Sequence, residues 1–202
     1  MEVAGWQVAR FVDRFVDGVR GQRVTVVAGS GNNGGDALVA ARFLHQRGAH
    51  VRASIVAARD PNSLAARHAA TIGRLGIPML EAPQGIDPSA NVVVDGLFGI
   101  GIRLPLRDPA PRIIEAMNAS QVPIVAVDAP SGLDADSGAG REGAVRAAAT
   151  ITLVALKSAL RGNPNAGRVF VADIGMPVGL FSSEQEALAG LYQIGDIVEL
   201  TN

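Results

Sequence analysis

The residues best suited to chemistry lie in three short segments, each directly after a run of apolar residues. The first, Gly29–Asp36, reads G-S-G-N-N-G-G-D and satisfies the pattern G-x-G-x-x-G between an expected strand and an expected helix. Glycines without a Cβ let backbone N–H groups approach a phosphate, and the start of the next helix favours negative charge. The pattern predicts a phosphate-bearing ligand; the alternative is a tight strand-to-helix turn.

Ordinary dinucleotide-binding folds carry a further acidic residue at the end of the second strand, where it holds the ribose. Here that strand ends in S-I-V-A-A-R, with no carboxylate before Asp60. The two asparagines and Asp36 are also polar groups that a plain phosphate cradle does not require. Both observations disfavour NAD-linked hydride transfer.

The other two segments place a carboxylate at the end of a strand. Asp95 is followed by glycines at positions 96, 99 and 101, and Asp128 is followed by A-P-S-G, which includes Ser131. Either carboxylate could instead cap a turn. Because ligands bind at the carboxyl ends of the strands in such sheets, we expect the three segments to line one crevice.

If the segments converge, Asn33, Asp95 and Ser131 supply an amide oxygen, a carboxylate and a hydroxyl. These hard oxygen ligands suit an alkali or alkaline-earth cation and are poor ligands for zinc or copper. Lys157, the only lysine, follows an expected strand and could carry chemistry or extend from the sheet edge into solvent. The three histidines are isolated, which favours structural roles.

Alternating patterns predict how these segments are positioned. Short β-branched runs predict buried strands, and apolar residues at three- and four-residue spacing predict helices of about ten residues between them. We therefore expect an α/β fold, a three-layer αβα Rossmann-like sandwich with a mainly parallel sheet, in a single domain over residues 1–202. The expected strands are 23–28, 50–56, 77–80, 91–95, 122–128, 150–156 and 168–174; the expected helices are 8–19, 37–46, one opened and capped at Asp60, and 111–119.

Composition excludes several classes of protein. The formal net charge is −1, which argues against a duplex nucleic-acid binder, and there are no cysteines for disulfides, zinc ribbons or thiol catalysis. The sequence has neither a signal-peptide pattern nor an apolar run long enough to span a membrane. We expect a soluble, cytoplasmic protein.

The segments together resemble the NAD(P)H-hydrate epimerases, the YjeF N-terminal domain family. The resemblance rests on M-E-V-A-G at the start, Gly29–Asp36, D-G-L-F-G-I-G from Asp95, V-D-A-P-S-G around Asp128, and T-I-T with Lys157. It covers almost the whole chain, and the N-N-G-G-D element is highly specific.

The resemblance implies an enzyme that interconverts the R and S forms of hydrated NADH and NADPH, with one potassium ion per subunit held by Asn33, Asp95 and Ser131. Family members commonly form homodimers and work with an NAD(P)H-hydrate dehydratase, which we expect here to be a separate chain. The residues implied to contact the substrate are Asn32, Asn33, Gly34, Gly35, Asp36, Gly99, Ile100, Gly101, Ile102, Arg103, Leu104, Pro105 and Asp128.

The substrate carbon carries a hydroxyl beside a ring nitrogen, so inversion requires loss and return of that hydroxyl. Asp128 is our candidate for the catalytic acid and base, with Lys157 as a second proton-transfer or charge-stabilising group. The alternative in another class is a non-catalytic nucleotide-binding or scaffold module of the same fold.

Overall fold

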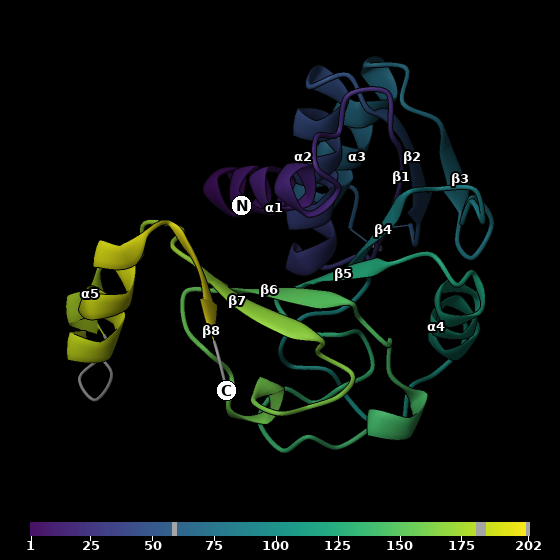
Figure 1. The fold of residues 1–202 in the computed structure, drawn as a ribbon. Helices are drawn as coiled ribbons and strands as arrows, with labels where there is room; N and C mark the ends of the chain where they lie inside the picture. The colour runs from purple at the N-terminus through teal and green to yellow at the C-terminus, as the bar shows by residue number, and fades with distance from the viewer. Residues whose placement is uncertain (58–59, 181–184, 201–202) are drawn as a thin grey trace.

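The structure, a computed structural model, describes residues 1–57, 60–180 and 185–200. One eight-stranded sheet runs through the molecule, flanked by helices on both faces (Figure 1). In chain order the elements are α1 (Glu2–Phe15), β1 (Arg23–Ala28), α2 (Asn32–Gln46), β2 (His50–Ile55), α3 (Leu64–Arg74), β3 (Met79–Glu81), β4 (Val92–Gly96), α4 (Ala110–Ala119), β5 (Ile124–Val127), η1 (Arg141–Gly143), β6 (Ala149–Leu153), η2 (Ser158–Leu160), β7 (Arg168–Ala172), η3 (Val178–Leu180), α5 (Gln185–Ile194) and β8 (Ile197–Leu200).

The strand order is β3-β2-β1-β4-β5-β6-β7-β8, and the first seven strands are parallel. Only β8 is antiparallel, paired with β7. The chain leaves β1 toward β2 on one side and returns to β4 on the other, so the sheet has a topological switch point between β1 and β4. Ligands bind at such a point, outside the carboxyl ends of the strands. The predicted three-layer α/β fold with a mainly parallel sheet is confirmed.

The core lies on both faces of the sheet because successive side chains of a strand point to opposite sides. Val24 and Val26 of β1 pack in the cluster that holds α1, α2 and Ile72 of α3, whereas Val27 packs in the cluster that holds Ile113 of α4. Every residue of β4 and β5 is buried, as expected for central strands covered on both faces.

Two helices begin earlier than predicted. The helix α1 starts at Glu2 rather than Val8, because Gly5 lets it approach α2: a Cβ on Gly5 would lie 2.5 Å from Val39 Cβ. The helix α2 starts at Asn32 rather than Ala37, with Gly31 at its N-cap position. The expected glycine-rich loop is therefore partly the first turn of a helix.

The third helix begins at Leu64, and its N-cap is Ser63, whose hydroxyl accepts a hydrogen bond from Ala66 N at 3.2 Å. The prediction that Asp60 caps this helix is wrong, because the Asp60 carboxylate accepts a bond from Asn62 N in the preceding turn. Several expected strands were one to three residues too long, and α5 and β8 were not predicted.

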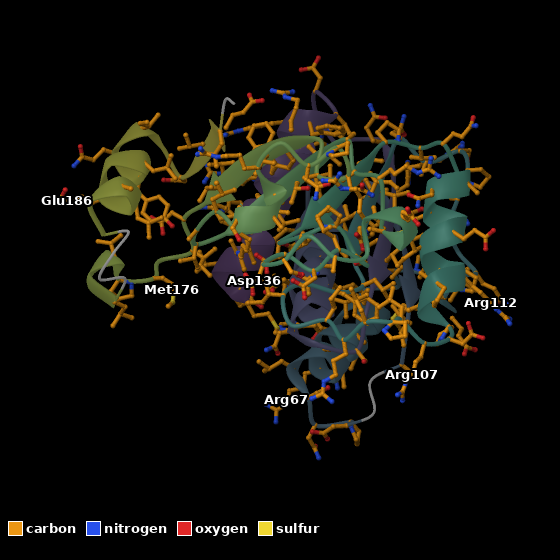
Figure 2. The ribbon with its side chains drawn as sticks, turned by 90° about the horizontal axis from the view of Figure 1, so that it is seen from below. Arg67, Arg107, Arg112, Asp136, Met176 and Glu186 are labelled. Atoms are coloured by element: carbon orange, nitrogen blue, oxygen red, sulfur yellow. The ribbon has the colours of Figure 1, made fainter. Side chains whose placement is uncertain are left out.

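Charged side chains lie around the outside of the molecule, with Arg67, Arg107, Arg112 and Glu186 pointing away from the sheet (Figure 2). No helix within residues 1–57, 60–180 and 185–200 is long and apolar enough to cross a membrane.

Candidate functional site

A buried carboxylate at the end of β4 joins two of the three predicted segments. Asp95 Oδ1 accepts a hydrogen bond from Ser131 Oγ at 2.6 Å and one from Leu97 N at 3.1 Å, and its Oδ2 accepts from Ser131 N at 2.8 Å. Ser131 Oγ also accepts from Phe98 N at 2.8 Å. Asp95 is fully buried, and burial raises its pKa to about 6 although the bonds from Ser131 and Leu97 act to lower it. Hydrogen bonds to the Asp95 carboxylate thus connect the loops after β4 and β5.

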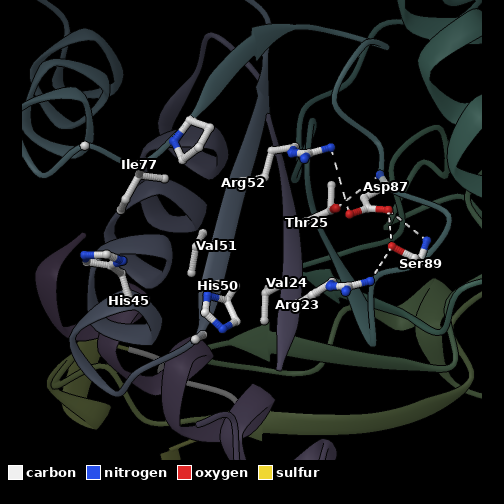
Figure 3. Close-up of a pocket in the computed structure, with 13 residues that line it drawn as sticks. Arg23, Val24, Thr25, His45, His50, Val51, Arg52, Ile77, Asp87 and Ser89 are labelled. Atoms are coloured by element: carbon white, nitrogen blue, oxygen red, sulfur yellow. Dashed lines mark hydrogen bonds and ion pairs between the residues drawn. The ribbon is translucent and has the colours of Figure 1, made fainter. Parts of the chain in front are cut away.

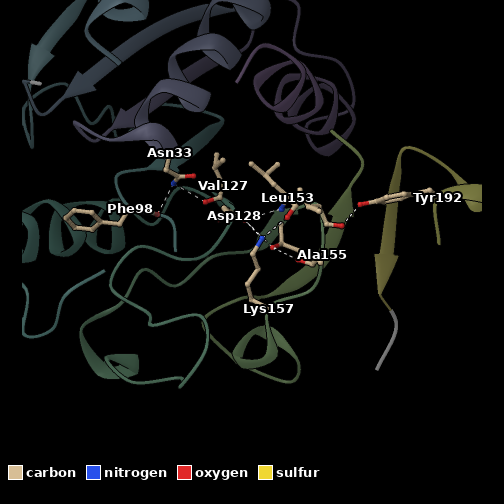
Figure 4. A network of polar contacts seen from close by, with 10 residues as sticks. Asn33, Phe98, Val127, Asp128, Leu153, Ala155, Lys157 and Tyr192 are labelled. Carbon is tan, nitrogen blue, oxygen red and sulfur yellow. Dashed lines mark hydrogen bonds and ion pairs between the residues drawn. The ribbon is translucent and has the colours of Figure 1, made fainter. Parts of the chain in front are cut away.

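Asn33 brings in the third segment from the first turn of α2. Its Nδ2 donates to Phe98 O at 2.8 Å and to Val127 O at 3.1 Å, so one side chain bridges the loop after β4 and the end of β5 (Figure 4). Gly99 leaves room for it, because a Cβ there would lie 3.2 Å from Asn33 Oδ1. Asn33, Asp95 and Asp128 thus converge, as predicted, at the carboxyl ends of β1, β4 and β5, a region we call the rim.

Asp128 and Lys157 form an ion pair at this rim. The Lys157 ammonium contacts Asp128 Oδ1 and donates to Leu153 O at 2.7 Å, and Asp128 Oδ1 also accepts from Leu153 N at 3.1 Å (Figure 4). Asp128 adopts φ 67°, the left-handed region that an Asp side chain tolerates better than most. Lys157 does not extend into solvent. The preceding strand, β6, ends at Leu153, and the chain turns back at Val154, φ 69°.

Asp36, the fifth residue of α2, is a second acidic group at the rim. The residue is 8% exposed, and burial raises its pKa to about 7; the Met1 ammonium opposes this shift and the charge of Asp128 adds to it. The nearest cationic group is the Met1 amine, 3.8 Å from Asp36 Oδ1.

Asn33, Asp36 and Asp128 line a cavity of about 460 Å³ at the carboxyl ends of β1, β4 and β5. Eight of the residues predicted to contact substrate line it: Asn32, Asn33, Asp36, Gly99, Ile100, Gly101, Ile102 and Asp128. Ser30, Phe98 and Leu153, which the sequence did not single out, line it as well. The position of Leu153 follows from the early end of β6, which no sequence pattern signalled.

A second cavity of about 570 Å³ shares Ser30, Leu97, Phe98 and Ile102 with the first and extends toward α4. It contains the remaining predicted loop residues, Arg103, Leu104 and Pro105. Together the two adjoining spaces can accommodate an elongated ligand.

Gly34 and Gly35 line neither cavity, so the prediction that they contact substrate has no support in the structure. A Cβ on Gly34 would lie 1.9 Å from Gly29 O, and one on Gly35 would lie 2.7 Å from Met1 Sδ. These glycines permit close packing of α2 against β1 and α1.

The oxygen atoms around Asp95 fit a hard cation. Asn33, Asp95 and Ser131 are linked through Phe98, and the Asp95 carboxylate pairs with no Lys, Arg or His in the described part of the chain. A buried anion without a cationic partner is costly, so a bound cation at this position would stabilise the fold. Among residues 1–57, 60–180 and 185–200, no cluster of three or more His, Asp or Glu could hold a metal ion.

A further cavity of about 430 Å³ lies at the other end of the strands, around the amino ends of β1 and β2 (Figure 3). Its polar side chains pair with one another: Arg23 Nη1 donates to Ser89 Oγ at 2.9 Å, and Arg52 lies 3.9 Å from Asp87. Hydrogen bonds from Ser89 lower the pKa of Asp87. This pocket shares no residue with the candidate site.

Known proteins resemble this chain along most of its length. The family model of the YjeF-related protein N-terminus matches residues 1–159. The bifunctional NAD(P)H-hydrate repair enzyme Nnr of Mycobacterium tuberculosis is 38% identical over 170 residues, which are 84% of this chain and 34% of that protein. The NAD(P)H-hydrate epimerase of Limosilactobacillus fermentum is 38% identical over 157 residues, 75% of this chain and 74% of that protein.

A solved structure agrees with the fold as well. The crystal structure of the yeast protein YNL200c superimposes with a TM-score of 0.83 at 27% identity, covering 99% of this chain and 88% of that one. The chain spans about a third of the length of the bifunctional relatives, 34% in the mycobacterial case. On the match to residues 1–159, the chain belongs to the family of YjeF-related protein N-termini.

Proposed function

We propose that this protein is an NAD(P)H-hydrate epimerase, an isomerase that interconverts the R and S forms of hydrated NADH and NADPH and so repairs damaged cofactor. The observation that carries the proposal is the cavity lined by Asn33, Asp36 and Asp128 in a chain of this family. The relatives named as epimerases support the assignment. A scaffold module would not need buried carboxylates around an open cavity, which disfavours the non-catalytic alternative.

The reaction follows from the hemiaminal chemistry of the substrate. Protonation of the hydroxyl beside the ring nitrogen lets the nitrogen lone pair expel water and leaves a planar iminium. Water then adds to the opposite face, and its excess proton goes to a base. Asp128 can exchange protons at the cavity wall, and the Lys157 ammonium beside it holds the carboxylate in place and balances its charge.

The two cavities suggest how the substrate lies. The hydrated ring, which needs acid and base groups, belongs in the space beside Asp128. The free N–H groups at the start of α2 suit a phosphate. The remaining nucleotide then extends into the adjoining space lined by Arg103, Leu104 and Pro105.

A potassium ion held by Asn33, Asp95 and Ser131 belongs to the same proposal. It would neutralise the buried Asp95 charge and fix the two loops that carry Phe98 and Asp128. Its contribution would be electrostatic and structural. We also propose a separate NAD(P)H-hydrate dehydratase as functional partner, which the fused relatives named bifunctional support. A homodimer, a single-domain boundary at 1–202 and a cytoplasmic location stay predictions.

The test starts from pure R-hydrate of NADH or NADPH and follows the appearance of S-hydrate by chromatography, with and without potassium. The wild type is expected to equilibrate the epimers far faster than buffer alone. Asp128→Asn should lower kcat by about 100-fold or more, the range of general acid–base catalysis. The control is Asp17→Asn, an exposed position beyond α1 with φ 53°, where Asn is well tolerated.

The oxygen atom of the product tests the chemistry directly. In water enriched in ¹⁸O, loss and return of water puts solvent oxygen into the S-hydrate that the enzyme forms. S-hydrate that retains the original oxygen would exclude the iminium route. Asp128→Asn with wild-type rates and intact substrate binding would exclude Asp128 as the proton-transfer group.

A further inference from the structure

Asp36 differs from the other carboxylates of the site because its hydrogen-bonding capacity is free. Its side chain is 12% exposed and lines the cavity of about 460 Å³ together with Asp128. Within the described ranges, no hydrogen bond from another residue reaches the Asp36 carboxylate. Asp95 by contrast accepts three, and Asp128 accepts bonds from Lys157 and Leu153. A buried polar group without a partner is costly unless a ligand satisfies it.

Resting on the proposed function, we propose that Asp36 is a second catalytic carboxyl group, which exchanges a proton with the substrate from the α2 wall of the cavity while Asp128 does so from the β5 wall. The two groups come from different elements, the N-terminal part of α2 and the loop after β5, and both border the space proposed for the hydrated ring. Water leaves from one face of the carbon and returns to the other, so a proton-transfer group on each of two walls of the cavity suits an inversion.

The surroundings of the two carboxyl groups are opposite in kind. Burial raises the pKa of Asp36 to about 7, and no other side-chain cation acts on it strongly; the charged groups that affect it are the Met1 ammonium at the start of α1 and the Asp128 carboxylate. Asp128 has the Lys157 ammonium in direct contact. Near neutral pH, Asp36 can therefore hold a proton. Two carboxyl groups whose environments differ in this way are typical of an acid and base pair.

The two groups supply and take up one proton in each conversion. Protonated Asp36 gives its proton to the substrate hydroxyl, the C–O bond breaks, and the nitrogen lone pair forms the C=N bond of the iminium. Water adds to the opposite face, the C–O bond forms, the C=N electron pair returns to nitrogen, and Asp128 takes the proton that the water releases. One proton has then moved from Asp36 to Asp128, and proton exchange with water in the cavity returns it before the next R-hydrate reacts. The other epimer is converted with the two roles exchanged.

This mechanism requires one proton shared between the two carboxyl groups. The rate should therefore fall at high pH, where Asp36 has lost its proton. The high-pH limb should lie near the Asp36 pKa of about 7. A purely structural or binding role for Asp36 gives no reason for that limb to disappear in a variant.

The experiment measures kcat, KM and the pH profile for R-hydrate with the wild type, Asp36→Asn, Asp36→Glu and the exposed control Asp17→Asn. Asn has nearly the same shape as Asp and carries no charge, so Asp36→Asn is expected to fold. Its kcat should fall by about 100-fold or more with KM changed by less than about threefold, and the high-pH limb should vanish. Asp36→Glu should recover part of the rate and restore the limb, and Asp17→Asn should match the wild type.

The outcomes separate the two proposals. A wild type that leaves R-hydrate unchanged refutes the epimerase function itself. An active wild type, with Asp36→Asn that retains kcat within about threefold or loses only substrate affinity, overturns the catalytic role of Asp36 and leaves the epimerase function standing.

Discussion

Replacing Ser131 by alanine removes the hydroxyl that joins the loops after β4 and β5. Ser131 Oγ donates to the buried Asp95 carboxylate at 2.6 Å and accepts from Phe98 N at 2.8 Å. A hydrogen bond to a charged group contributes about 1.5–3 kcal/mol, and leaving a partly buried N–H without an acceptor costs about 1 kcal/mol more. We expect Ser131→Ala to lower the free energy of unfolding by about 3 kcal/mol.

Urea denaturation followed by far-UV circular dichroism measures this loss, and a chain of this size should show a fall in Tm of about 6–12 °C. Ser137→Ala is the matched control, because Ser137 is exposed and its hydroxyl contacts, with Ala139 N at 3.3 Å and with the Asp134 carboxylate, are open to water. The control should change stability by less than about 0.5 kcal/mol.

A double-mutant cycle with Asp95→Asn isolates the contact. Without the Asp95 charge, the Ser131→Ala change should cost at least about 1 kcal/mol less than it does in the wild type. If Ser131→Ala lowers stability by under about 1 kcal/mol, or if its cost is the same in both backgrounds, the reasoning that these loops are fastened to a buried charge is wrong.

Two further changes test the packing and the charge of α2. Gly34→Ala should lower the free energy of unfolding by more than about 3 kcal/mol, because its Cβ would lie 1.9 Å from the backbone oxygen of Gly29. Its control is Gly31→Ser, at an N-cap position with open space, which should change the free energy of unfolding by less than about 0.5 kcal/mol in the same urea denaturation assay. For Asp36, the folded-state pKa of about 7 lies above the ordinary 3.8, so the folded protein binds more protons in this window and its stability falls by up to about 1.4 kcal/mol per unit as pH rises toward 7. The free energy of unfolding of Asp36→Asn, relative to that of the wild type, should therefore rise by about 2 kcal/mol between about pH 5 and pH 8. If this difference does not change with pH, the raised pKa is contradicted.

The sheet could be predicted because its central strands are buried on both faces. The runs at 23–28 and 91–95 are continuous and β-branched, which is how parallel strands under two helical layers must look. Convergence of Asp95 and Asp128 then follows from topology, because parallel strands end at the same edge. The register confirms it, with Val27 opposite Asp95 and Asp95 opposite Ala126.

The start of α2 could not be read from the same patterns. Glycine disfavours helices, so N-N-G-G-D reads as a loop, yet Gly34 and Gly35 lie in the first turn of α2. At Gly34 only hydrogen fits, because a Cβ would lie 1.9 Å from the backbone oxygen of Gly29. Tertiary packing outweighs propensity at these positions. The contact of Lys157 with Asp128 was equally hidden, since it depends on β6 ending at Leu153 and the turn at Val154.

The three carboxylates at the rim differ in how many of their oxygen lone pairs are already engaged, and this limits what each can do. Asp95 is fully buried, accepts three hydrogen bonds and lines neither cavity, so it can fasten loops or hold a cation but cannot exchange a proton with substrate. Asp128 reaches the cavity with its Oδ1 engaged by Lys157 and Leu153, which fixes its position. Asp36 reaches the same cavity with neither oxygen hydrogen-bonded to a described residue, at the cost of burying a carboxyl group. Stability alone would favour asparagine at that position, and a free carboxyl group facing the cavity is suited to chemistry with a ligand.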